Sequence, residues 1–219
     1  MPRTARIVIP GTPHHITHRG NNREAVFLCE HDYWHYVRLL LRYAQAEHMR
    51  ILGYCLMPNH VHIVAIPAWE ATFERVFRET QRRYTTHFNR KHKRAGHLWQ
   101  NRYYSCPMDE SHTINALAYV ELNPVRAGLA GTPDAYPWSS AEAHCRRDRP
   151  DPLLNLERWH SYWTAEEWRN KLHQIAEDRG FGESLRRCSQ RGTPLGDAAF
   201  RKKMREKLQE TAARRTGPS

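Results

Sequence analysis

An apolar run from Ile51 to Ile66, divided by a turn, constrains the fold of this chain more than any other feature. Pro58 and Asn59 are turn-forming residues, and the stretches on both sides are rich in aliphatic and β-branched residues. This pattern predicts a β-hairpin with strands at 50–57 and 60–66. The apolar residues around the turn are expected to bury the second strand.

Two histidines, His60 and His62, stand on the second of these strands, on either side of Val61. Successive side chains of a strand point to opposite faces, so both imidazoles project from one face, about 7 Å apart along the chain. Two imidazoles placed in this way can hold one divalent metal ion. Taken alone, the pair is explained more simply as two half-exposed histidines on the polar face of a strand. Other residues of the chain are needed to favour a metal site over this interpretation.

Strands and helices alternate through the first two-thirds of the chain. We expect further strands at 6–10, 14–19 and 103–108, and helices at 32–47, at 71–90 and from 109 or 111 to 122. This order predicts an α+β fold, in which helices cover one face of a mostly antiparallel sheet and the other face is free for a site. Two helical stripes are apolar: Trp34, Val37, Leu41 and Ala44 in one, and Phe73, Val76, Phe77, Tyr84 and Phe88 in the other.

The last third of the chain has a different pattern. Residues 146–152 are rich in arginine, aspartate and proline and are expected to form a linker. Beyond it, helical periodicity covers 156–178, 181–190 and 196–213. We therefore divide the chain into a first domain, 1–147, and a basic helical C-terminal region, 148–219, which is a candidate accessory DNA-binding module.

Charge is the compositional property that bears on function. Lys and Arg number 34 against 23 Asp and Glu, the net charge is +11 and the pI is about 9.7, which favours a polyanionic partner such as nucleic acid. Basic, amide and aromatic side chains gather in the loop 19–23, on the helix 71–90 and in the connector 90–104. Our candidate DNA contacts are Arg19, Asn21, Asn22, Arg23, Arg78, Arg82, Arg83, Lys91, Lys93, Arg94, Trp99, Arg102 and Arg126.

The cysteines and the N-terminal sequence are informative about the cellular compartment. Five widely spaced cysteines, without a C-x-x-C pair, are most simply reduced thiols. No stretch reaches the length of a membrane span, and the N-terminus lacks the apolar core of a signal peptide. We expect no membrane partner and a cytoplasmic, nucleoid-associated protein.

A second set of polar residues lies on the helix that ends near 122. Asn115, Tyr119 and Asn123 follow one another at intervals of four residues and share one face, although Pro124 favours a distorted last turn at Asn123. If this face meets the strand histidines, His60, His62 and the amide oxygen of Asn123 could bind Mg²⁺ or Mn²⁺. Tyr119 would then present its phenol to a phosphodiester, helped by nearby positive charge. Considered without the histidines, Tyr119 is explained more simply as a tyrosine of the core or of the surface.

Several strings, taken in order, resemble a known family. PNHVHIV is the HUH motif (His, hydrophobic, His), and it is accompanied by HHITHRGNNR, LWQNRYYS and YVELNPVRAG. Over about residues 5–147 the chain resembles the IS200-like single-tyrosine transposases, and most of all the REP-associated tyrosine transposases of bacteria. The segment RGTPLGDAAF is similar to a stretch often found near their C-terminus.

The resemblance implies a ferredoxin-like sheet with the histidine pair on a central strand. It also implies metal-dependent nicking and rejoining of single-stranded DNA at palindromic hairpins, through a 5′-phosphotyrosine that leaves a free 3′-hydroxyl. By this resemblance the nucleophile is Tyr119 and the metal ligands are His60, His62 and Asn123, which stands where related transposases often have Gln. A second tyrosine four residues after Tyr119, typical of two-tyrosine relaxases and replication initiators, is missing.

Two other classes of enzyme with paired histidines do not fit the motifs of this chain. A histidine-triad hydrolase needs a third histidine where this chain has Val64, and two-histidine phosphoesterases need separated His-x-Thr/Ser motifs. The serious alternative is a non-catalytic, sequence-specific DNA-hairpin-binding protein derived from a transposase. The partner is in either case single-stranded or hairpin DNA, and the chain could act as a monomer or as a homodimer that exchanges its tyrosine helix.

Overall fold

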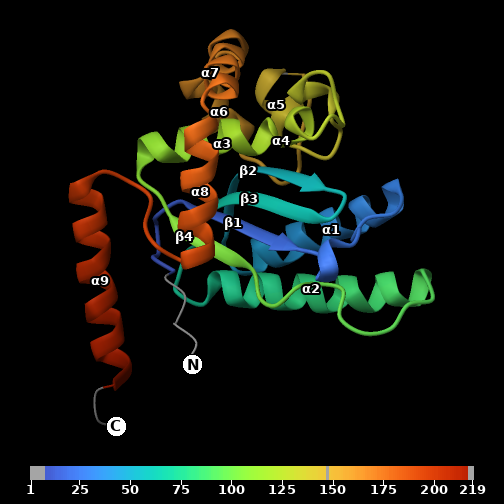
Figure 1. Ribbon diagram of the computed structural model, residues 1–219, viewed down its shortest axis with the longest axis horizontal. Helices are drawn as coiled ribbons and strands as arrows, with labels where there is room; N and C mark the ends of the chain where they lie inside the picture. The colour runs from blue at the N-terminus through green and yellow to red at the C-terminus, as the bar shows by residue number, and fades with distance from the viewer. Residues whose placement is uncertain (1–7, 147, 217–219) are drawn as a thin grey trace.

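The computed structural model of the chain describes residues 8–146 and 148–216. Its centre is a four-stranded sheet of β1 (His14–Arg19), β2 (Arg50–Met57), β3 (His60–Ile66) and β4 (Tyr104–Pro107), in the order β2-β3-β1-β4. All neighbouring strands are antiparallel. With helices between β1 and β2 and between β3 and β4, this is the ferredoxin-like α+β fold that the sequence predicted (Figure 1).

The predicted hairpin is present, and its register sets the orientation of the histidines. Met57 pairs with His60 next to the turn, and a bulge between Ile51 and Gly53 shifts the register farther along. On the other side of β3, Thr17 of β1 lies opposite His62 and Arg19 lies opposite His60. Directly opposed residues point to the same face of a sheet, so β1 and β3 present these side chains together.

Two helices, α1 (Glu30–Ala46) and α2 (Thr72–Lys91), pack against the face of the sheet opposite to these histidines (Figure 1). The ring of Phe73 in α2 lies 5.1 Å from that of His14, and Ile16 is fully buried between the layers. The predicted stripe of α2 is confirmed, because its five members are all inaccessible. The predicted stripe of α1 is wrong at Trp34, which is 54% exposed, because Tyr33 takes the inward position.

The face with His60 and His62 is partly covered by α3 (Glu110–Glu121) and α8 (Arg179–Arg191). In Figure 1, α8 runs in front of the strands and α3 lies above β2. Gly53 permits the close approach of α3, because a Cβ atom there would lie 2.5 Å from Leu117 Cδ2. Asp109 caps α3 by accepting a hydrogen bond from the His112 backbone N–H at 2.8 Å. The site therefore lies between helices on this face.

The C-terminal region shares the core of the first domain. The expected helix 156–178 is two helices, α6 (Leu156–Tyr162) and α7 (Ala165–Glu177), because Thr164 and Glu167 form a capping box that starts a new helix. Trp168 of α7 is fully buried, and its Nε1 donates a 2.8 Å hydrogen bond to Glu121 Oε2 at the end of α3. The described parts of 1–147 and 148–219 thus pack as one unit.

The other elements are the short helices η1 (Asn21–Arg23), α4 (Asn123–Arg126), η2 (Pro133–Ala135) and α5 (Ala141–Cys145). A long helix, α9 (Ala198–Thr216), stands apart from the sheet in Figure 1. The expected strand at 6–10 falls partly outside the described residues, and its described part, 8–10, is not a strand. Within the described residues, no helix combines the length and apolarity needed to span a membrane.

Candidate functional site

The predicted histidine pair lies on the central strand β3, with both rings on the same face. The ring centroids of His60 and His62 are 4.9 Å apart and the rings are nearly perpendicular, at 78°. His62 is buried, whereas His60, beside the turn, is partly exposed. Burial and the nearby Arg19 lower the pKa of His60 to about 4. Burial, together with the neighbouring His60 and His15, lowers the pKa of His62 well below the ordinary 6.5. Both imidazoles are therefore neutral at physiological pH, as metal ligands must be.

A hydrogen bond within the turn fixes the His60 ring. His60 Nδ1 lies 2.6 Å from Asn59 Oδ1, while Asn59 Nδ2 donates to the Arg23 carbonyl at 3.0 Å. Because an amide oxygen only accepts, Nδ1 of His60 carries the proton, and its Nε2 keeps a free lone pair. His60 is therefore in the tautomer that a metal-binding Nε2 requires.

A chain of hydrogen bonds through two further residues orients the ring of His62, and neither residue was among the predicted site residues. Its Nδ1 lies 2.9 Å from His15 Nε2, and His15 Nδ1 lies 2.7 Å from Ser189 Oγ. All three residues are buried, and burial lowers the pKa of His15 to about 3. A proton on His62 Nδ1 would thus leave its Nε2 free to bind a metal. Ser189 comes from α8, in the C-terminal region.

Tyr119 of α3 stands next to the histidines, as predicted. Its ring centroid lies 6.3 Å from that of His62, with the rings nearly perpendicular at 84°. The guanidinium of Arg126 lies 4.7 Å from the centre of the tyrosine ring and donates to the carbonyls of Tyr119 and Ile175. Arg126 was a predicted DNA contact, and its place beside the phenol also suits it to stabilise negative charge there.

Asn123 lies in the distorted turn that Pro124 predicted. The helix α3 ends at Glu121, and α4 begins at Asn123 with Pro124 in its first turn. The amide nitrogen of Asn123 donates to the carbonyls of Tyr119 and Val120 at 3.1 and 3.2 Å. These bonds orient the side chain, and its oxygen remains as the acceptor that a metal ligand needs.

One pocket of about 560 Å³ collects these residues. Besides the predicted site residues, its walls include polar side chains from β1, from the end of the 90–104 connector and from α8. The lining residues are His15, Thr17, Arg19, Met57, His60, His62, Gln100, Tyr104, Tyr119, Asn123, Arg126, Ala127, Arg186 and Gln190. Arg19, Arg126 and Arg186 make the pocket positive and suited to a phosphodiester.

The predicted DNA-binding loop lies at the same end of the sheet. Gly20 N–H donates to the carbonyl of Asn59, and Asn59 in turn donates to the Arg23 carbonyl, so the loop and the β2–β3 turn are tied together. Asn22 and Arg23 are exposed and both have positive φ. Asn21, Asn22 and Arg23 are therefore presented beside His60.

Other predicted DNA contacts lie elsewhere. Arg78, Arg82 and Arg83 are exposed on α2, beyond the opposite face of the sheet, and surround Glu79 at 3.8, 2.8 and 3.7 Å. Lys93 and Arg102 are exposed in the connector.

Three members of the predicted basic and aromatic cluster are engaged within the protein. Lys91 forms an ion pair with the buried Asp32, and Arg94 forms one with Glu24. Trp99 is only 8% exposed and its ring stacks on that of His18, at 4.7 Å between centroids. The expectation that Trp99 stacks on a DNA base is corrected, because its ring is part of the core.

The chain matches the model of one protein family, "Transposase IS200 like", over residues 11–123, slightly more than half of its 219 residues. The matched segment contains the strand histidines, Tyr119 and Asn123. The chain therefore belongs to the IS200-like transposase family. No curated protein matches the sequence.

Solved structures extend the comparison to the fold. A REP-associated tyrosine transposase bound to a REP hairpin aligns with a TM-score of 0.56 and 18% identity, over 70% of this chain and 91% of that one. A Deinococcus radiodurans R1 protein described as a transposase aligns with a TM-score of 0.39 and 17% identity, over 55% of this chain and 96% of that one. The first match shows that the fold is that of a tyrosine transposase.

Proposed function

We propose that this protein nicks and rejoins single-stranded DNA beside palindromic hairpins, with Tyr119 as the nucleophile and a divalent metal ion at His60 and His62. The observation that carries the proposal is the convergence of these residues. Histidines from β3, Tyr119 from α3 and Asn123 from the start of α4 all line one basic pocket. A protein that only bound DNA would have no physical need for a phenol beside two neutral imidazoles.

The reaction at Tyr119 is a transesterification. Its phenolic oxygen forms a bond to phosphorus, and the bond from phosphorus to the 3′ oxygen of the preceding nucleotide breaks. The phenol proton passes to solvent, and the departing 3′ oxygen takes a proton from water to become a free hydroxyl. A phenol is a poor nucleophile at neutral pH, so positive charge has to stabilise the attacking oxygen. The guanidinium of Arg126, 4.7 Å from the ring centre, supplies it.

The donor set fits a divalent metal ion. His60 and His62 would offer Nε2 atoms and Asn123 its amide oxygen, a mixture that accepts Mn²⁺ or Mg²⁺. When bound, such an ion polarises a non-bridging phosphate oxygen. The hydrogen bonds that His60 and His62 donate to Asn59 Oδ1 and His15 Nε2 hold the two imidazoles in position for this role. Arg19 and Arg186 line the same pocket and can hold the phosphates on either side of the scissile one.

The DNA structure that we propose as substrate is a hairpin with a single-stranded flank. The REP-associated transposase that aligns with this chain was solved with a REP hairpin. The exposed Asn22 and Arg23 lie beside the pocket and can contact the flank. The exposed Lys93 and Arg102 extend the basic surface from there along the connector.

A cleavage assay tests the proposal. A labelled hairpin oligonucleotide with single-stranded flanks is incubated with the protein and Mn²⁺ or Mg²⁺, and products are separated on a denaturing gel. We expect Tyr119→Phe to abolish cleavage and His60→Ala to reduce it at least 100-fold, about the cost of losing one strong transition-state interaction. Tyr162→Phe is the control, because Tyr162 on α6 is 70% exposed. Equal cleavage by wild type and Tyr119→Phe would reject the nucleophile. Hairpin binding without cleavage by the wild type would instead favour the non-catalytic DNA-binding protein.

A further inference from the structure

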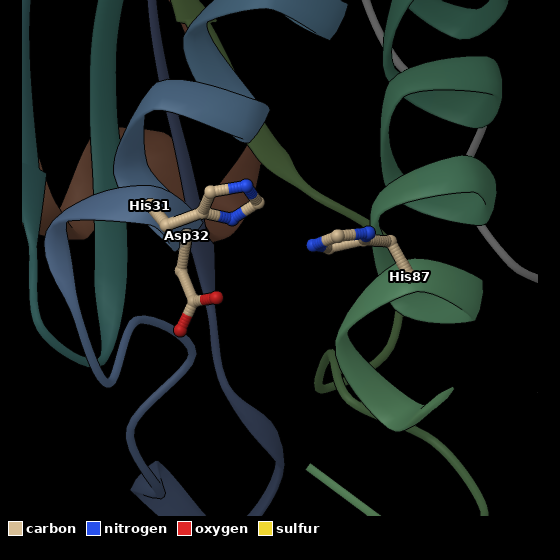
Figure 2. Close-up of side chains that lie close together, drawn as sticks. All are labelled: His31, Asp32 and His87. Atoms are coloured by element: carbon tan, nitrogen blue, oxygen red, sulfur yellow. The ribbon is translucent and has the colours of Figure 1, made fainter. Parts of the chain in front are cut away.

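A second cluster of metal-ligand side chains lies between α1 and α2, beyond the opposite face of the sheet from the pocket. His31 and Asp32 come from the first turn of α1, and His87 comes from α2. Each offers one ligand atom, and these atoms all lie within 4.8 Å of one another. Figure 2 shows the two imidazoles turned toward each other from the facing helices, with Asp32 beside them.

The chemistry of His87 points to a missing ligand. Its Nε2 is buried, and among the described residues no hydrogen-bond partner reaches it. A buried polar atom without a partner is costly and unusual in a folded protein. His35 stacks on the same ring, at 3.8 Å between centroids, so three imidazoles gather here. Burial and neighbouring charge lower the pKa of His87, and lower that of His35 to about 4, so both are neutral at physiological pH.

A positive charge already occupies part of the cluster. The ammonium of Lys91 lies 2.8 Å from Asp32 Oδ1, 2.9 Å from Cys29 Sγ and 3.5 Å from His31 Nδ1. Oxygen, sulfur and nitrogen donors therefore surround one cation. Lys91 is the last residue of α2 and its side chain is 31% exposed, so it can swing into solvent. Asp32 keeps its other oxygen on His92 and on the Leu28 backbone N–H.

We propose that His31, Asp32 and His87 bind a divalent transition-metal ion of the zinc class, which takes the place of the Lys91 ammonium at Asp32 Oδ1. Two imidazoles and a carboxylate are common ligands of zinc, and water can complete a tetrahedron. The ion would join the start of α1 to the end of α2 and stabilise the helical layer. This site is separate from the pocket and does not depend on the proposed function.

The test measures metal binding with the pocket disabled. In the double variant His60→Ala, His62→Ala, titration calorimetry with Zn²⁺ is expected to show one tight site, and Co²⁺ is expected to give the visible absorption of a tetrahedral ion. Adding His87→Gln should weaken Zn²⁺ binding at least 10-fold. His97→Gln, an exposed histidine in the connector, is the matched control and should leave the affinity unchanged.

Lys91→Met provides the decisive variant, because it is expected to improve binding rather than remove it. Without the competing ammonium, Zn²⁺ affinity should rise about 10-fold, a result that unfolding of the variant cannot mimic. Zn²⁺ should also raise the melting temperature of the double variant but not of its His87→Gln derivative. Absence of a Zn²⁺ site in the double variant, equal affinities for His87→Gln and His97→Gln, or no gain in Lys91→Met would each overturn the proposal. None of these outcomes bears on cleavage at Tyr119.

Discussion

The side chain of His62 is held by two buried residues, of which only His15 lines the pocket. His15 holds it through a 2.9 Å hydrogen bond, and Ser189 holds His15 through one of 2.7 Å. Such partners behind a metal ligand set its tautomer and ring orientation. The C-terminal region thereby supports the strand histidines directly, even though 174 positions separate Ser189 from His15.

Ser189→Ala is expected to weaken metal binding at His60 and His62 by about 10-fold, since losing a partner behind a ligand typically costs 10–100-fold in affinity. His15 then loses its anchor and His62 gains rotational freedom. Mn²⁺ binding followed by electron paramagnetic resonance, in the His87→Gln background, measures the effect. Ser184→Ala, on the same helix, serves as the control. An unchanged Mn²⁺ affinity in Ser189→Ala would show that the ring of His62 is held by packing alone.

The predictable part of the site is the part that local periodicity controls. Two-residue spacing placed His60 and His62 on one face, and four-residue spacing placed Tyr119 and Asn123 on another, and both faces meet in the pocket. His15 lies in the string HHITHRGNNR, but no spacing in the sequence links His15 or Arg186 to the strand histidines. Their position depends on strand register and on how α8 packs. The pairing of Thr17 with His62 could have suggested His15, two residues earlier on the same face.

The contact between α8 and α3 is close enough to require glycine. A Cβ atom on Gly182 would lie 2.5 Å from Cε2 of the Tyr119 ring. Phe181, next to it, also packs near this ring, at 6.4 Å between centroids. The first turn of α8 therefore fixes how the phenol lies, and Tyr119 is only 5% exposed.

Gly182→Ala is expected to destabilise the protein by about 1–3 kcal/mol, because extra volume in a packed contact forces the helices or the ring to shift. Gly180→Ala, in the same turn, is the matched control. Its Cβ atom would meet only Asp178 Oδ1 at 3.6 Å, and alanine favours a helix more than glycine does, so stability should not fall. Urea unfolding of both variants measures the difference. Equal midpoints would contradict the close contact.

Helices and strands were predictable to within one or two residues where one element is long and strongly patterned, as in α2 and β3. The predicted bounds were wrong where a helix-start signal lies inside a continuous helical pattern. The 156–178 pattern continues across Thr164, but a capping box breaks it there. The face predicted to be free for a site is partly covered by α8, because only the tertiary fold brings residues 179–191 back to the sheet.

Histidines that stay neutral in the fold link the stability of the whole molecule to pH. The folded-state pKa of His15 is about 3 and that of His60 about 4, both below the ordinary 6.5. Below pH 6.5 the unfolded chain takes up protons that the folded chain excludes, so stability falls as pH is lowered and stops falling near the folded pKa values. Each such group contributes a slope of about 1.4 kcal/mol per pH unit at most.

Urea unfolding in EDTA at pH 7.5 and pH 5 is therefore expected to show a clear loss of stability at the lower pH. His15→Gln should reduce that loss, because it removes one group that must stay neutral in the fold. The same pH dependence in wild type and His15→Gln would show that folding does not lower the pKa of His15.

If Tyr119 is the nucleophile, it becomes covalently joined to DNA, and peptide mapping of a trapped adduct detects this bond. The protein is incubated with a hairpin oligonucleotide and Mn²⁺, denatured and digested, and the DNA-linked peptide is sequenced by mass spectrometry. Tyr104 lines the same pocket and is the competing phenol. We expect a 5′-phosphate on the peptide that contains Tyr119, in wild type and in Tyr104→Phe. An adduct on Tyr104, or cleavage without any adduct, would contradict it.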